Sequence, residues 1–251
     1  MLSIDKILDK STDNLLGGVP EGYDGVVLSQ LIDADQTVLF VARDDRRMAA
    51  LKASLAFFAS DVEVIEFPAW DCLPYDRVSP KSDIIAARID ALTNLVDRQQ
   101  DQPRIILTTI AALLQRVPAR KSLEGSSLTF GEGGETLRDR LLGYLEQNGY
   151  GRSETVMEPG EYAIRGGIID LFPPGFDEPL RLDFFGDDLD GIRTFEPFSQ
   201  RTSGERESFT LKPVNEISLD EDAISRFRTA YRALFGAVSS EDPLYEAVSE
   251  G

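Results

Sequence analysis

The first part of the chain contains an apolar run that is typical of a strand covered on both faces, Thr37-Val38-Leu39-Phe40-Val41-Ala42. Asp44 follows this run and is a suitable N-cap for an amphipathic helix that reaches Phe58. Parallel strands need a crossover connection, which is usually a helix. A buried strand directly before a helix therefore predicts one unit of a parallel sheet.

The sequence on both sides of this run repeats the alternation of helix and strand. Helices are expected at 23–32, at 82–95 with Ser82 or Asp83 as the cap, and at 109–116, and further strands at 62–67 and 104–108. Strands separated by helices imply parallel pairing with right-handed crossovers. We therefore expect an α/β domain in the first 117 residues.

The pattern changes near residue 118, where a second domain is expected to begin and to run to residue 205. A helix capped by Thr136 is expected through Leu145, and only short strands follow it, at 161–165, 167–172, 180–185 and 191–195. Gly166-Gly167 is a tight-hairpin signal between the first two strands. This order predicts a smaller α+β domain with an antiparallel meander.

Residues 206–251 hold one more strand at 209–213 and an Asp220-capped helix that reaches Phe235. This remainder is too short for a core of its own. We expect it to pack on the first domain, or else to be the start of a segment that is cut off.

Composition excludes several functional classes. The chain has 251 residues, 26 basic and 44 acidic side chains, a net charge of −18, no histidine and one cysteine. The acidity argues against a stand-alone nucleic-acid binder, because phosphates are neutralised by clustered Lys and Arg. The absence of histidine excludes Ser-His-Asp triads and imidazole bases. No apolar run approaches the roughly 20 residues that cross a bilayer, and one cysteine allows no internal disulfide, so we expect a cytoplasmic protein.

A glycine-rich loop at residues 17–25 lies where a helicase-type P-loop would cradle phosphates. Such a loop needs a Lys for the phosphates and a Ser or Thr for Mg²⁺, and at these positions the chain has Asp24 and Gly25, after Gly18 and Gly22. A carboxylate would repel a triphosphate. The loop is either a degenerate nucleotide site or a glycine-rich turn, and both readings predict that no nucleotide or other cofactor binds.

The second domain carries a candidate interaction patch. Strand alternation places Leu180, Leu182 and Phe184 on an inner face, and it places Arg181, Asp183 and Phe185 on the outer face. In the strand at 161–165, Ala163 and Arg165 share one face. A large aromatic beside arginines is typical of an interface anchor, whereas alternating polar residues alone are usually only solvated. Both readings remain open, and Phe185 is the residue that solvation explains least well.

Three further features indicate structure more than chemistry. The apolar loop at 68–75 holds the only Trp and is interpreted as a lid of the core. Cys72 has no neighbouring His or Lys that would activate it. The spacing of four carboxylates, Asp183, Asp187, Asp188 and Asp190, matches no Ca²⁺ loop, and a solvated turn is the favoured interpretation.

Several stretches resemble the N-terminal part of the bacterial transcription-repair coupling factors (the Mfd family), which is itself similar to the repair protein UvrB. The resemblance spans nearly the whole chain, and the long block that starts at Glu158 is the most specific. The matching stretches are Trp70–Asp76, Ser79-Pro80, Asp83–Arg88, Glu158–Pro173, Arg181–Asp187 and Ser199–Thr202.

The resemblance implies a degenerate helicase-like (RecA-like) domain with an inserted smaller domain that binds the damage-recognition ATPase UvrA. It places the contact residues on Arg165, Arg181 and Phe185, and it implies a non-catalytic adaptor. The motor and polymerase-binding domains of such a factor lie outside this chain, so DNA and RNA polymerase would be reached only through them, and another domain of the factor would mask the patch. The alternatives are a structural brace without a partner patch and a residual DNA-remodelling ATPase.

Overall fold

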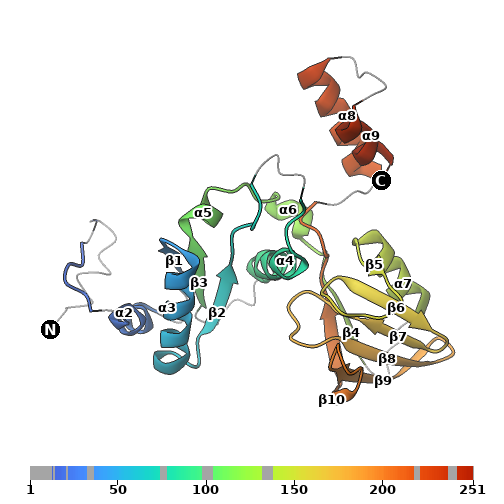
Figure 1. The fold of residues 1–251 in the computed structure, drawn as a ribbon, viewed down its shortest axis with the longest axis horizontal. Coiled ribbons are helices and arrows are strands. Elements are labelled where there is room, and N and C mark those ends of the chain that lie inside the picture. Colours follow the sequence, from blue (N-terminus) through green and yellow to red (C-terminus); the bar gives the residue numbers. More distant parts are fainter. Residues whose placement is uncertain are drawn as a thin grey trace. The chain divides into compact units, whose positions relative to one another are not determined.

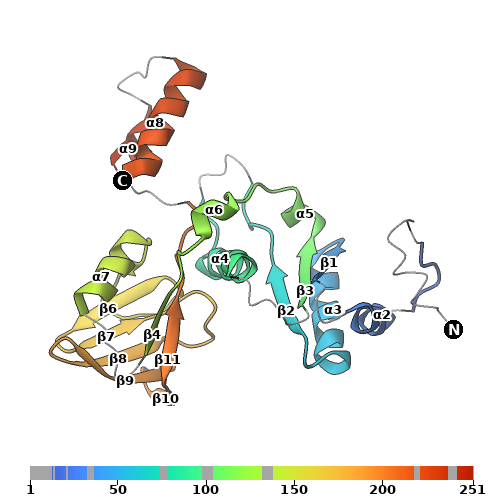
Figure 2. The same ribbon diagram turned by 180° about the vertical axis from the view of Figure 1, so that it is seen from behind.

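The computed structural model describes residues 13, 15–20, 22–32, 37–73, 78–97, 104–131, 138–217, 221–236 and 242–250. The chain divides into two compact units, Met1–Ser127 and Leu128–Gly251. Figures 1 and 2 show the elements of each unit from opposite sides. Parallel strands occur in the first unit and a mainly antiparallel sheet in the second, so the molecule is a mixed α/β protein.

The first unit contains a three-stranded parallel sheet in the order β1-β3-β2, as the alternation of helix and strand predicted. Its described elements are α2 (Tyr23–Leu31), β1 (Thr37–Ala42), α3 (Asp45–Phe58), β2 (Glu63–Phe67), α4 (Ser82–Val96), β3 (Arg104–Thr109), α5 (Ile110–Leu113) and α6 (Arg120–Leu123). Ile105 and Leu107 of β3 pack with Leu51 and Leu55 of α3. The opposite face buries β2 side chains with Ala91 of α4.

In this unit one helix cap agrees with the prediction from the sequence and another does not. The Asp44 carboxylate accepts a hydrogen bond from the Arg47 backbone N–H at 2.8 Å, so the predicted N-cap of α3 is confirmed. Helix α4 instead begins after Lys81, with Ser82 and Asp83 already inside it. The prediction of a Ser82 or Asp83 cap was wrong because the extended backbone ends one residue earlier, at Lys81.

The second unit combines a six-stranded sheet, a two-stranded sheet and three helices among the residues described in it. Its elements are β4 (Leu128–Gly131), α7 (Arg138–Gln147), β5 (Gly151–Arg152), β6 (Glu161–Arg165), β7 (Ile168–Leu171), β8 (Leu180–Phe185), β9 (Asp188–Phe195), β10 (Thr202–Arg206), β11 (Ser208–Leu211), α8 (Glu221–Phe235) and α9 (Pro243–Glu250). The six-stranded sheet has the order β10-β9-β8-β7-β6-β5. Leu141 and Leu145 of α7 join its core with Phe130 of β4 and Phe209 of β11.

A two-residue turn joins β6 to β7, as Gly166-Gly167 predicted. Arg165 pairs with Ile168 across this turn, and Gly166 has a φ of 61°, which favours glycine. A side chain at Gly167 would lie 2.8 Å from the Phe184 carbonyl oxygen. The second glycine therefore allows the hairpin to approach β8 closely.

The domain boundaries differ from those expected at residues 117 and 205. The second unit begins at Leu128, and β11 belongs to it because β11 pairs antiparallel with β4. Residues 208–211 therefore belong to the second unit. The structural reason is the stacked pair of Phe130 and Phe209, whose ring centroids are 5.4 Å apart.

Some expectations lie outside the described residues, including the caps Thr136 and Asp220 and the end of the 68–75 loop from Pro74 to Tyr75. Within the described part of the chain, no helix is long and apolar enough to cross a membrane. No group of three or more potential metal ligands occurs in that part either.

Candidate functional site

The two faces of β8 have the side chains that strand alternation predicted. Leu180, Leu182 and Phe184 are buried in the main core of the second unit. Phe185 is 85% exposed, and Arg181 and Asp183 are partly exposed on the opposite face. We call this opposite side of the six-stranded sheet the outer face.

The outer face is not uniformly open to solvent. A second apolar cluster covers part of it and consists of Val156, Ala163, Phe172 and Phe195. The segment after β5 runs beside β6, where Ser153 donates its N–H to the Tyr162 carbonyl oxygen at 2.8 Å. This segment buries Val156 and Ala163, so the sheet has a small core on its outer side as well.

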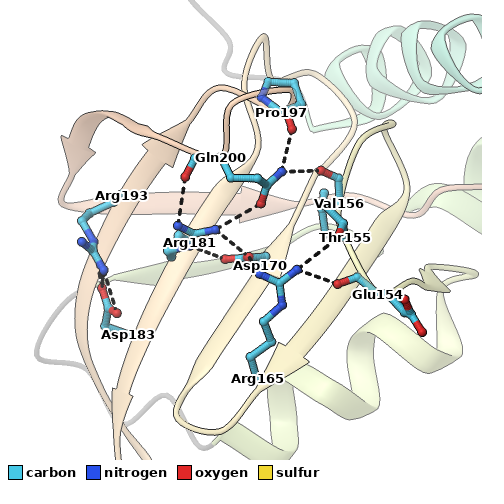
Figure 3. Close-up of polar contacts among 10 residues, drawn as sticks. All are labelled: Glu154, Thr155, Val156, Arg165, Asp170, Arg181, Asp183, Arg193, Pro197 and Gln200. Atoms are coloured by element: carbon cyan, nitrogen blue, oxygen red, sulfur yellow. Dashed lines mark hydrogen bonds and ion pairs between the residues drawn. The ribbon is translucent and has the colours of Figure 1, made fainter.

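Arg181 is held by a buried carboxylate on the neighbouring strand. Its Nε and Nη2 donate to the two oxygens of Asp170 at 2.7 and 2.8 Å, and the Asp170 side chain is only 1% exposed (Figure 3). These hydrogen bonds raise the pKa of Arg181 above its ordinary value. The guanidinium also lies over the Phe195 ring, 4.6 Å from its centroid. Arg181 is therefore fixed in orientation, with a charge that its partner largely neutralises.

Arg165 is the more accessible of the two arginines. Its Nη2 donates to the Glu154 carbonyl oxygen at 2.6 Å and to the Thr155 hydroxyl at 3.2 Å, and its side chain is 48% exposed. Its Nη1 lies 4.0 Å from the Asp170 carboxylate. Figure 3 shows Arg165 and Arg181 converging on Asp170 from β6 and β8. Two cationic groups thus share one buried anion.

Phe185 lies at the other end of β8, next to the turn that leads into β9. It lies four positions along the strand from Arg181, which corresponds to about 13 Å in an extended strand. Between them, the Asp183 carboxylate accepts two hydrogen bonds from the Arg193 guanidinium, at 2.9 and 2.8 Å. The structure therefore brings Arg165 and Arg181 together and leaves Phe185 as a separate exposed point.

The glycine-rich loop of the first unit is occupied by internal contacts. Asp24, in the first turn of α2, accepts a hydrogen bond from the Arg47 guanidinium at 2.5 Å. The Ser54 hydroxyl donates to the carbonyl oxygen of Gly22, whose φ is 85°. A Cβ at Gly25 would lie 2.3 Å from the Ser54 hydroxyl oxygen. A serine or threonine at Gly25 would require the Ser54 side chain to move.

A hollow of about 320 Å³ lies beside this loop. Among the described residues its lining is mainly apolar, and the charged members there are Asp24 and Arg47, which are paired with each other. Gly18, with a φ of 68°, precedes the loop residue Val19 that lines the hollow. Apolar walls and a neutralised ion pair do not attract a triphosphate.

The second unit corresponds to a known domain family. Residues 128–217 match the model of the UvrB interaction domain. Over 238 residues, or 94% of the chain, the sequence is 37% identical to the transcription-repair-coupling factor of Haemophilus influenzae. The corresponding factor of Escherichia coli is 37% identical over 85% of the chain, and that of Myxococcus xanthus is 34% identical over 84%. The chain belongs to the transcription-repair-coupling factor family and corresponds to a segment of such a factor. It spans about a fifth of the length of these relatives, 20%, 18% and 18% respectively.

The UvrB interaction domain of this coupling-factor segment coincides with strands β4 to β11. The match begins at Leu128, which is also the first residue of the second unit, and it ends six residues after β11. Arg165, Arg181 and Phe185 all lie within the matched range. The strand pairing and the family match therefore delimit the same domain.

Two residues of the coupling-factor outer face were not predicted from the sequence. Asp170 interrupts the apolar strand β7 and lies directly opposite Arg181 in the ladder. A lone carboxylate inside a buried strand indicates a paired cation, so a partner for Asp170 could have been predicted from the sequence. Gln200, whose carbonyl and side-chain oxygens accept hydrogen bonds from Arg181, follows β9 in a turn and has no such signal.

Proposed function

We propose that this chain is a non-catalytic adaptor that binds UvrA through the outer face of its second unit. As part of a coupling factor, it would recruit nucleotide-excision repair to stalled RNA polymerase, which other parts of such a factor would contact. The observation that carries this proposal is the 85% exposure of Phe185, on the same sheet face as Arg181, within a UvrB interaction domain. A large apolar side chain on a polar face is typical of an interface anchor.

The three residues would contribute in different ways. Arg165 is half exposed and would pair with carboxylates of the partner. Phe185 would fill an apolar pocket. Arg181 donates through all three guanidinium nitrogens within the chain, so it would mainly shape the surface.

The first unit is proposed to be a degenerate helicase-like domain into which the second unit is inserted. The Asp24–Arg47 pair and the close contact at Gly25 support this reading, because both occupy positions where a nucleotide loop would need a free cation and a hydroxyl. We expect no heat of binding when ATP and Mg²⁺ are titrated into the chain. Micromolar affinity would contradict the proposal and favour a residual ATPase.

The adaptor role is tested by titrating purified UvrA into the wild-type chain and into Arg165→Ala, Arg181→Ala and Phe185→Ala. Phe57→Ala is a matched control, because Phe57 is 81% exposed on α3 of the first unit, and Arg43→Ala is the control for a surface arginine. Removing an anchor typically costs about 2 kcal/mol or more, which is roughly thirtyfold in affinity. We expect such losses at the outer face and none for the controls.

The ionic strength provides a second readout. Because arginines would meet an acidic surface, the affinity of the wild-type chain should fall as salt is added, and the Arg165→Ala variant should show a weaker salt dependence. Equal affinity of all variants would contradict the proposed patch, and absence of binding by the wild-type chain would leave a structural brace as the remaining interpretation.

A further inference from the structure

A second exposed phenylalanine belongs to a turn that is tied to Arg181. Phe198 follows β9 and is 85% exposed, the same fraction as Phe185. Two residues later, the Gln200 carbonyl and side-chain oxygens each accept a hydrogen bond from the Arg181 guanidinium, at 3.3 Å (Figure 3). The turn at residues 196–201 is thus continuous with the cationic part of the outer face.

The turn is held rigidly by its own hydrogen bonds. The Glu196 carboxylate accepts from the backbone N–H groups of Phe198 and Ser199, at 3.0 and 2.6 Å. The Gln200 amide nitrogen donates to the carbonyl oxygens of Pro197, at 2.6 Å, and Val156, at 3.3 Å. Phe198 is therefore presented from a backbone that is ordered on both sides.

Gln200 has a φ of 59° and is the only non-glycine residue with a positive φ in the described part of the chain. A left-handed conformation at a residue with a long side chain is strained, and it persists only where surrounding contacts determine it. Here those contacts come from Arg181, Pro197 and Val156. These contacts, which outweigh the strain at Gln200, hold the turn in the shape that exposes Phe198.

We propose that the turn at residues 196–201 is part of the partner-binding surface and that Phe198 is its second aromatic anchor. This inference rests on the proposed binding of UvrA. The partner would offer a second apolar pocket for Phe198, in addition to carboxylates for Arg165. An anchor on a preorganised turn loses little conformational entropy on binding, so more of its contact energy appears as affinity.

The test titrates purified UvrA into the Phe198→Ala, Phe185→Ala and Phe57→Ala variants of the full chain. We expect Phe198→Ala to weaken binding about tenfold and Phe57→Ala to leave it unchanged. Because the Phe198 side chain is 85% exposed, its removal should not change the melting temperature. Phe198→Leu should retain most of the affinity, since leucine still fills an apolar pocket.

Preorganisation has its own readout in a double-mutant cycle with Glu196→Ala. That substitution removes the carboxylate that holds the Phe198 and Ser199 N–H groups. The loss caused by Phe198→Ala should therefore be smaller in the Glu196→Ala background than in the wild type.

The outcomes separate this inference from the proposed function. Wild-type affinity for Phe198→Ala, together with a loss for Phe185→Ala, overturns the role of Phe198 and leaves UvrA binding intact. Loss for Phe57→Ala as well would show unspecific apolar binding and overturn the inference. Absence of binding by the wild-type chain overturns both proposals.

Discussion

At the scale of single residues, Asp170 and Glu196 are two of 44 acidic side chains, yet each organises part of the outer face. Asp170 binds Arg181 through both oxygens, and Glu196 accepts two backbone N–H groups. Both are charge-assisted hydrogen bonds, which are stronger than neutral ones. In this acidic chain, Asp170 and Glu196 therefore have specific structural roles.

The pH response of Glu196 follows from its hydrogen bonds. Donation by the Ser199 hydroxyl, and then by the Ser199 and Phe198 N–H groups, lowers the pKa of Glu196 below its ordinary value of 4.5. A lowered pKa in the folded state means that the turn is stabilised above pH 4.5 and loses this stabilisation as the pH falls through the folded pKa. A ¹³C NMR titration of the Glu196 carboxyl should show a midpoint below 4.5.

Ser199→Ala is the matched variant for this titration. It removes the hydroxyl donor and keeps the backbone N–H, so the midpoint should move toward 4.5 without reaching it. A wild-type midpoint at or above 4.5 would show that the turn is not held by Glu196.

At the scale of elements, the strands β7, β8 and β9 carry two ion pairs in contrasting environments. Asp170 and Arg181 lie directly opposite each other in the β7–β8 ladder, and Asp170 is buried. Asp183 and Arg193 bridge β8 and β9 with similar distances, but their side chains are 30% and 37% exposed. The same chemistry on one sheet should therefore contribute differently to stability.

We expect Asp170→Asn to lower the free energy of unfolding of the second unit by about 2 to 4 kcal/mol, because it leaves a largely buried guanidinium without its counter-charge. Asp183→Asn is the matched control and should cost less than about 1 kcal/mol. Urea denaturation followed by far-UV circular dichroism measures both. Equal losses in the two variants would contradict the role assigned to burial.

At the scale of the whole molecule, each unit has hydrophobic cores of its own. The clusters around Leu55 and Ile65 draw only on the first unit, and the clusters around Leu145 and Phe195 draw only on the second. The single tryptophan, Trp70, lies in the first unit, 5.0 Å from the buried Arg88 guanidinium. Its fluorescence therefore reports the first unit.

This separation predicts that the two units respond to different core substitutions. Phe209 is 3% exposed and stacked on Phe130, so Phe209→Ala should destabilise the second unit by about 3 to 5 kcal/mol without moving the Trp70 fluorescence transition in urea. Leu55→Ala, at a fully buried site in the first unit, should move that transition. A shift of the Trp70 transition by Phe209→Ala would contradict separate cores.

Much of the fold could be predicted because the relevant signals are local. The apolar run at 37–42, the Asp44 cap and the Gly166-Gly167 hairpin each depend on side chains close in sequence, and each is found where it was expected. The short helices α6 and α9 were missed. So were two strands without such a signal, the two-residue strand β5 and the polar edge strand β10. Their backbones are extended because neighbouring strands supply hydrogen bonds, which a local pattern does not reveal.

The sequence by itself determined which face of β8 each side chain occupies, because successive residues of a strand point to opposite sides. Only the tertiary structure decided which residues Arg181 contacts on the outer face. Its contacts with Asp170, Phe195 and Gln200 come from residues 11, 14 and 19 positions away. These contacts depend on the strand register and on the path of the turn after β9, and both are set by the packing of the whole sheet.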